Sequence, residues 1–181
     1  MRFHLTLLAL LSVMCTVGGC APAPEEQAAE QTVMQETLEG AWEITEESFK
    51  SPDASWTDTS PQPSLYIFAK QHYSIMLVPS GPDGRSQPRE LFSGTDPILG
   101  AAQPTDAEKV VAFGSFIANS GTYEVSGSSL TTRPIVAKTP NFMSGGALTF
   151  MYQIEGDTLH LTNTPPWAPD TEQSLTLVRL E

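Results

Sequence analysis

The first apolar segment after the N-terminal region alternates between two faces, and this pattern limits the fold more than any other feature of the sequence. In residues 38–45, Gly40, Trp42 and Ile44 fall on one face, and Glu39, Glu43 and Thr45 fall on the other. This period of two is typical of a β-strand that has one face in a core and the other in water. The sequence therefore predicts a half-buried opening strand with Trp42 inside.

The chain ends on a matching segment. In residues 174–180, Leu175, Leu177 and Arg179 share one face, so that an arginine stands in an otherwise apolar row. A guanidinium group in such a row needs a partner, and the flat face of an aromatic ring supplies one through a cation–π contact. We therefore predict that the two ends of the chain pair and that Arg179 stacks on Trp42.

Further segments between these two have the length and composition of strands. They are residues 64–69, 72–78, 122–125, 129–136, 147–154 and 158–162. Short connections such as Lys70-Gln71 join neighbouring segments and predict hairpins. Together with the two end strands they make eight, the number that closes a barrel with room for side chains or one small ligand. The sequence predicts an all-β fold, an eight-stranded antiparallel barrel.

Two long loops and one helix interrupt this pattern. Residues 49–63 and 79–100 are rich in proline, and we expect both to run over the surface as loops. Thr105 with Glu108 three residues later predicts a capping box and a helix start. An apolar stripe continues from there to Ile117. We expect this single short amphipathic helix to cover one end of the barrel.

Charge excludes one class of partner. The formal net charge is -12, and the nine lysines and arginines are dispersed. Nucleic-acid binding needs clustered basic side chains. We therefore expect no nucleic-acid partner.

Catalytic and metal-binding signals are weak. Both cysteines, Cys15 and Cys20, lie in the first twenty residues, so the folded domain has neither a disulfide nor a thiol nucleophile. Only His72 and His160 follow the N-terminal segment, and there is no Gly-any-Ser-any-Gly elbow and no phosphate loop. The sequence thus predicts no catalytic residue, no metal site and no cofactor.

The N-terminus has the pattern of a secretory signal over residues 1–19: a basic start, an apolar run and two glycines. The apolar run is too short for a comfortable membrane span. The four residues Val17-Gly18-Gly19-Cys20 resemble the lipobox of bacterial lipoproteins. That resemblance implies cleavage before Cys20, a diacylglycerol on its thiol and an acyl chain such as palmitate on its amine. The alternative is an ordinary secreted protein with Cys20 as an unmodified thiol.

Residues 20–37 are rich in proline, alanine, glutamate and glutamine and predict a flexible acidic tether. By the lipoprotein resemblance, Ala21 in place of aspartate favours the outer membrane. The expected location is the cell envelope, with the protein anchored through Cys20 to the outer membrane and facing the periplasm.

The order of segments in residues 38–181 resembles the bacterial lipocalin-like domain family, which has a calycin-type barrel. The motifs that carry this resemblance are Gly40-Ala41-Trp42, the Gly-any-Trp of lipocalins, the strand Gly121-Thr122-Tyr123-Glu124-Val125, the turn Asn141-Phe142 and the hairpin Glu155-Gly156-Asp157-Thr158-Leu159-His160-Leu161. The resemblance implies a barrel base made of Gly40, Trp42 and Arg179. The two long loops and the mid-chain helix depart from the secreted animal lipocalins.

The predicted interior is apolar with a few phenol hydroxyls, which suits a small hydrophobic ligand oriented by one or two hydrogen bonds. On the second strand, alternation leaves either Tyr66 and Phe68 or Leu65 and Ile67 inside. The candidate ligand-binding residues are Tyr66, Phe68, Tyr73, Ile75, Tyr123, Phe150 and Tyr152. Three functions stay open: a lipid-anchored binding protein for a small hydrophobic molecule, a non-enzymatic envelope interaction module with a filled barrel, and an enzyme acting on a hydrophobic substrate.

Overall fold

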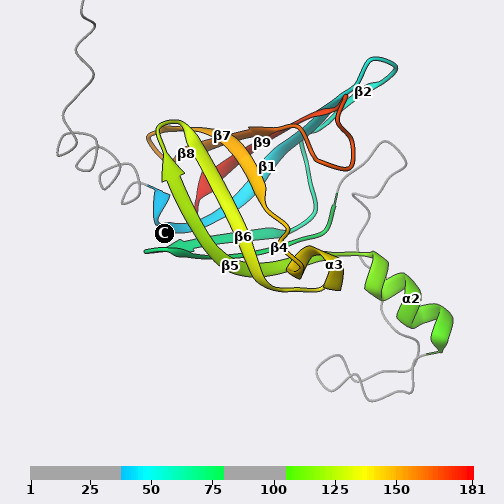
Figure 1. The fold of residues 1–181 in the computed structure, drawn as a ribbon. Helices are drawn as coiled ribbons and strands as arrows, with labels where there is room; N and C mark the ends of the chain where they lie inside the picture. Colours follow the sequence, from blue (N-terminus) through cyan, green and yellow to red (C-terminus); the bar gives the residue numbers. More distant parts are fainter. Residues whose placement is uncertain (1–37, 80–104) are drawn as a thin grey trace, which may run out of the picture.

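The computed structural model describes residues 38–79 and 105–181. In these ranges the chain forms an antiparallel barrel of eight strands, with one extra strand at its side and two short helices (Figure 1). The strands are β1 (Gly40–Lys50), β2 (Ser55–Asp58), β3 (Ser64–Ala69), β4 (His72–Leu77), β5 (Ile117–Ser126), β6 (Ser129–Ala137), β7 (Leu148–Glu155), β8 (Thr158–Asn163) and β9 (Glu172–Arg179). The helices are α2 (Asp106–Gly114) and α3 (Pro140–Met143).

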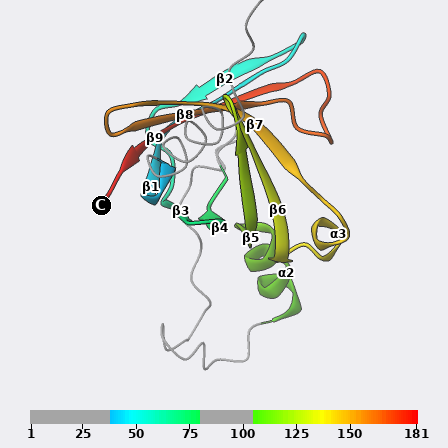
Figure 2. The ribbon, with the colours of Figure 1, turned by 60° about the vertical axis from the view of Figure 1, so that its left-hand side comes forward.

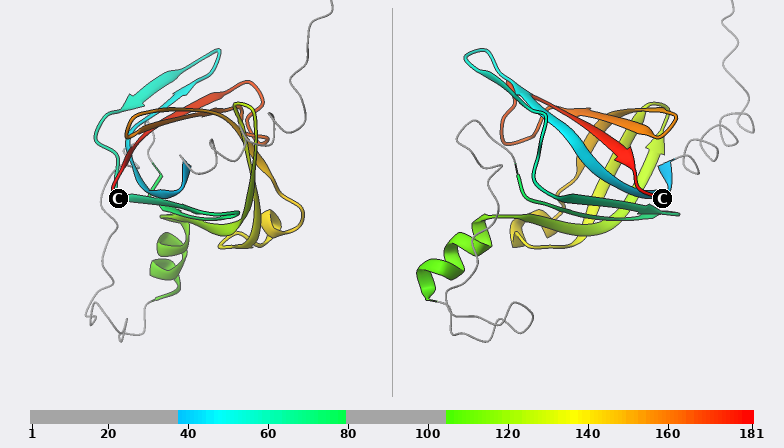
Figure 3. Two further views of the ribbon diagram at one scale, coloured as in Figure 1. Left: turned by 90° about the vertical axis from the view of Figure 1, so that its left-hand side faces the viewer. Right: turned by 180° about the vertical axis from the view of Figure 1, so that it is seen from behind.

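The barrel closes between the first and last strands. Neighbouring strands pair in the order β1-β3-β4-β5-β6-β7-β8-β9, and β9 pairs back onto β1, from Trp42 opposite Arg179 to Lys50 opposite Glu172. The left-hand view of Figure 3 shows the strands arranged as a ring. The predicted all-β fold and its eight-stranded antiparallel closure are confirmed.

The ninth strand corrects the prediction of a loop over residues 49–63. β1 continues to Lys50 and turns into β2, and Phe49 stacks on Trp56 with ring centroids 4.9 Å apart. Aromatic side chains on paired strands stabilise a hairpin that proline content alone disfavours. This hairpin lies beside the wall of the barrel (Figure 2). The other predicted loop, residues 79–100, lies almost entirely outside the described residues.

Helix α2 begins as predicted but does not cover the barrel. The Glu108 amide donates to Thr105 Oγ1 at 3.2 Å, and the Thr105 amide donates to Glu108 Oε2 at 2.7 Å, which completes the capping box. The helix ends at Gly114, and Ile117 instead begins β5.

The apolar side chains of α2 remain in water, with Val110 71% and Val111 57% exposed, and the helix points away from the barrel (Figure 1). Lys138 contacts the helix at its C-terminal end. The ammonium group of Lys138 donates to the carbonyl oxygens of Phe113 and Phe116. The prediction that α2 covers one end is therefore wrong: periodicity reveals an apolar face but not its partner. Neither described helix is long and apolar enough to cross a membrane.

A β-bulge in β1 changes which residues enter the interior. The register with β9 shifts between Ile44 and Glu46. Such a bulge inserts one extra residue, so the alternation of faces restarts one position later. Uninterrupted alternation would turn Glu46 inward, but Glu46 is exposed and Glu47 is buried, with 3% of its surface accessible. The barrel interior thus contains a glutamate.

Candidate functional site

The base of the barrel is filled by close-packed side chains around Trp42. Trp42, Leu38 and Leu177 have no accessible surface. The indole Nε1 of Trp42 donates to the Leu38 carbonyl oxygen at 3.0 Å. Next to them, Phe68 and Tyr123 meet edge to face with centroids 5.3 Å apart. Packing of this kind closes one end of the barrel.

Arg179 seals this base from outside. Its guanidinium lies 4.1 Å from the centroid of the Trp42 ring, and Nη1 donates to the Glu39 carbonyl oxygen at 2.5 Å. Gly40, at φ +135°, lies beneath it, where a Cβ atom would stand only 2.6 Å from Nη1 of Arg179. The structure therefore brings Gly40, Trp42 and Arg179 together at one end, with glycine required by the close approach of the arginine.

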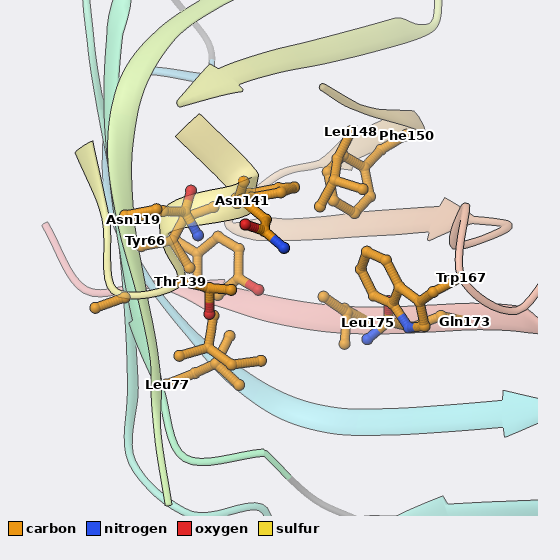
Figure 4. A pocket seen from close by; sticks show the side chains of 15 residues that line it. Tyr66, Leu77, Asn119, Thr139, Asn141, Leu148, Phe150, Trp167, Gln173 and Leu175 are labelled. Atoms are coloured by element: carbon orange, nitrogen blue, oxygen red, sulfur yellow. The ribbon is translucent and has the colours of Figure 1, made fainter. Parts of the chain in front are cut away.

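The opposite end of the barrel is hollow. A pocket of about 400 Å³ opens there, within the volume range typical of small-molecule sites. Its walls are mainly apolar and come from β3, β4, β5, β6, β7 and β9, from the connection through α3, and from the connection between β8 and β9 (Figure 4). The apolar lining includes Ile75, Leu77, Ile117, Phe142, Leu148, Phe150, Trp167 and Leu175.

The pocket contains some of the predicted ligand-binding residues and leaves others in the core. Tyr66, Ile75 and Phe150 line it. The other predicted residues lie in the buried core and outside the lining: Phe68, Tyr73, Tyr123 and Tyr152. Alternation identifies the face on which a residue lies but not its height along the barrel. On β3 it is Tyr66 and Phe68 that point inward, since Ile67 is 39% exposed.

Several lining residues were not predicted. Gln173 lies one inward position before Leu175 on β9, so extending the alternation of the closing strand by two residues would have identified it. Trp167 belongs to the connection between β8 and β9 and is 69% exposed at the pocket. Asn141 comes from α3. Trp167 and Asn141 lie outside the strands, so no alternation of apolar and polar residues could have identified them.

Neutral polar groups point into the pocket. Burial raises the pKa of the Tyr66 hydroxyl well above its ordinary value, and the negative charge of Glu47 raises it further. Burial also raises the pKa of Tyr73 to about 12. The Tyr73 hydroxyl donates to Asn119 Oδ1 at 2.7 Å, which leaves the Asn119 amide nitrogen available to the pocket. Tyr66 therefore stays a neutral hydrogen-bond donor at physiological pH.

The described residues contain no cluster of three or more His, Cys, Asp or Glu side chains able to hold a metal ion. His72 is exposed at the start of β4. His160 is half-buried on β8, with Nδ1 3.4 Å from Thr176 Oγ1. Neither histidine is among the lining residues of the pocket.

Comparison with known proteins adds little to this geometry. No family model matches the chain, and no curated protein sequence matches it. Among solved structures, the chain is similar to an uncharacterized protein from Bacteroides eggerthii DSM 20697, with 11% sequence identity and a TM-score of 0.39. The match covers 76% of this chain and 97% of that one. A likeness of this size supports no argument about function.

Proposed function

We propose that this chain is a lipid-anchored protein of the bacterial envelope whose barrel binds a small hydrophobic molecule. The observation that carries the proposal is the pocket of about 400 Å³ with predominantly apolar walls at one end of a barrel whose other end is packed. Removing apolar ligand surface from water in such a pocket contributes about 25 cal/mol per Å². Tyr66 and the Asn119 amide supply the few polar contacts that orient a ligand.

The lipocalin-like resemblance and the lipobox support the same proposal. The described barrel is packed at one end and hollow at the other, the form that a lipocalin-like binding barrel would need. The lipobox ends at Cys20, and the composition of residues 20–37 would suit a tether that holds the barrel away from the membrane. Several acyl chains anchor a protein stably, since each buried CH₂ contributes about 0.8 kcal/mol.

Filling the pocket is expected to weaken binding. Leu148→Trp places a large ring in the pocket space from β7, whereas Met151→Trp places the same ring on the outer face of the same strand, where Met151 is 56% exposed. An uncharged fluorescent apolar probe should bind the unsubstituted chain and the Met151 variant equally. The Leu148 variant should bind it at least about tenfold more weakly, which corresponds to about 1.4 kcal/mol.

Native mass spectrometry of the full chain from its own host, with extraction of whatever co-purifies, would identify the natural ligand. Repeated recovery of empty protein, together with no probe binding to the unsubstituted chain, would contradict the binding function. Equal probe binding by the two tryptophan variants would show that the probe binds elsewhere than in the pocket.

The anchor has its own test. Cys20→Ser removes the thiol that lipidation requires, so the protein should move from the membrane fraction to the soluble fraction. Cys15→Ser, five positions earlier in the apolar run, is the matched control and should leave the protein in the membrane fraction. Fractionation followed by immunoblotting measures both. A Cys20 variant that stays with the membrane would disprove lipidation at this residue.

A further inference from the structure

Two hydrogen-bond donors lie on one wall of the pocket. Tyr66 on β3 stands opposite Ile75 on β4, and Ile75 stands opposite Asn119 on β5. Residues paired in this way share one face of a sheet, and all three line the pocket. Figure 4 shows Tyr66 and Asn119 on the same side of it. The polar groups of this wall are therefore a phenol hydroxyl and an amide.

Tyr73 fixes the orientation of the Asn119 amide. Tyr73 lies in the buried core, and its hydroxyl donates to Asn119 Oδ1 at 2.7 Å. The oxygen and nitrogen of an amide diverge from one carbon atom, so an oxygen held by the core turns the nitrogen toward the pocket that Asn119 lines. An amide nitrogen only donates. Asn119 thus offers the pocket a donor.

The Tyr66 hydroxyl is the second donor. Tyr66 is 4% exposed, its hydroxyl points into the pocket in Figure 4, and this group has no hydrogen-bond partner within residues 38–79 and 105–181. Burial raises its pKa well above the ordinary value, so it stays protonated at physiological pH. A buried hydroxyl without a partner is unfavourable, and a ligand oxygen that accepts from it removes that penalty.

The lining provides no positive charge for an anion. Among the described residues that line the pocket there is no lysine, arginine or histidine. On the opposite side in Figure 4, the Gln173 amide already donates from Nε2 to Glu47 Oε1 at 3.1 Å. A carboxylate in this pocket would lose its hydration without gaining a cation, whereas an uncharged group has no such cost.

A carbonyl group suits the two donors better than a hydroxyl group. A carbonyl oxygen accepts two hydrogen bonds and brings no donor of its own. A hydroxyl group brings one more proton, and Asn119 Oδ1 on this wall already accepts from Tyr73. One donor would then remain without an acceptor, which is unfavourable in a buried site.

We propose that the pocket binds an apolar molecule through an uncharged carbonyl group, as in a long-chain ketone or ester, whose oxygen accepts from the Tyr66 hydroxyl and the Asn119 amide. This inference rests on the proposed binding function. It assigns the carbonyl group to the wall formed by β3, β4 and β5, and the hydrocarbon chain to the side chains of Leu148, Phe150 and Leu175.

The test measures competition with N-phenyl-1-naphthylamine, an uncharged fluorescent probe, on the full chain with Cys20→Ser, purified without detergent. The two competitors share one shape: methyl nonyl ketone and the alkene in which a methylene group replaces its oxygen. Tyr66→Phe removes only the hydroxyl, so the inhibition constant of the ketone should rise about tenfold while that of the alkene changes by less than about twofold. Comparing each ligand on two proteins cancels the difference in hydration between the ligands. An equal change for both would overturn donation by Tyr66.

Tyr152→Phe is the matched control. Its hydroxyl lies in the core, has no hydrogen-bond partner among the described residues and is outside the pocket lining. Neither inhibition constant should change. A selective loss of ketone binding as large as that of the Tyr66 variant would show that the effect does not arise at the proposed site.

Asn119→Asp tests the other donor. The carboxylate keeps an acceptor for Tyr73, and the hydrogen bond from Tyr73 favours its ionised form, which only accepts. The inhibition constant of the ketone should therefore rise about tenfold more than that of the alkene. An unchanged preference between the two ligands would remove Asn119 from the site.

Two further competitors test the chemical class and need no substitution in the pocket. The secondary alcohol that corresponds to the ketone should compete about tenfold more weakly than the ketone, and decanoate should compete more weakly still at neutral pH. Competition by the alcohol or by decanoate equal to that of the ketone would overturn the assignment of an uncharged carbonyl group.

The outcomes separate this inference from the function on which it rests. Failure of the unsubstituted pocket to bind the probe would contradict the binding function itself. Probe binding without discrimination among the competitors would contradict only the carbonyl assignment. Circular dichroism checks that the variants fold.

Discussion

Replacing Trp42 with alanine is expected to lower the free energy of unfolding by about 3–5 kcal/mol. The ring has no accessible surface and fills the base of the barrel. Its loss leaves a cavity, removes the hydrogen bond from Nε1 to the Leu38 carbonyl oxygen at 3.0 Å, and leaves the Arg179 guanidinium without the ring that it covers at 4.1 Å. Urea unfolding followed by circular dichroism measures the change.

Trp167→Ala is the matched control for this prediction. Trp167 is 69% exposed, so its removal should alter the free energy of unfolding by less than about 0.5 kcal/mol. The same variant separates an effect on stability from an effect on binding. Trp167 lines the pocket, so its removal should weaken probe binding while the free energy of unfolding stays nearly unchanged. Equal stability of the two alanine variants would mean that Trp42 does not hold the base together.

Gly121→Ala is expected to cost about 3 kcal/mol, the upper end of the range for overpacking. Gly121 is buried on β5 beside an irregularity in its pairing with β6. A Cβ atom there would stand 2.0 Å from the carbonyl oxygen of Arg133 and 2.8 Å from the amide nitrogen of Ile135. Both are backbone atoms and cannot rotate away, so the two strands must separate. Thermal and urea unfolding measure the loss.

Gly114→Ala makes the same chemical change where space is open. Apart from its chain neighbours and the backbone of its own helix, no atom lies within 4 Å of a Cβ built at this position at the end of α2. Alanine favours helix over glycine, so the free energy of unfolding should stay unchanged or rise by up to about 1 kcal/mol. A Gly121 variant as stable as the Gly114 variant would show that β5 and β6 tolerate a side chain between them.

The class of the fold and the pairing of the two ends of the chain could be predicted from the amino-acid sequence. Alternation around Trp42 and Leu177 marked two half-buried strands, and these strands pair in the structure. Thr105 and Glu108 marked the start of α2. These features were predictable because each depends on residues close together in the chain: the period of a strand and the reach of a cap are local properties.

The position of the pocket and the residues that line it depend on how the strands are staggered around the barrel, which no local pattern in the sequence reveals. Alternation places Tyr66 and Tyr73 on the inner surface equally, yet Tyr66 lines the pocket and Tyr73 lies in the core, because height along the barrel follows from the stagger of neighbouring strands. The bulge after Ile44 turns Glu47 inward in place of Glu46. No local pattern in the sequence predicts this bulge. The exposed apolar face of α2 likewise shows that a helix pattern specifies a surface while the rest of the chain determines what covers it.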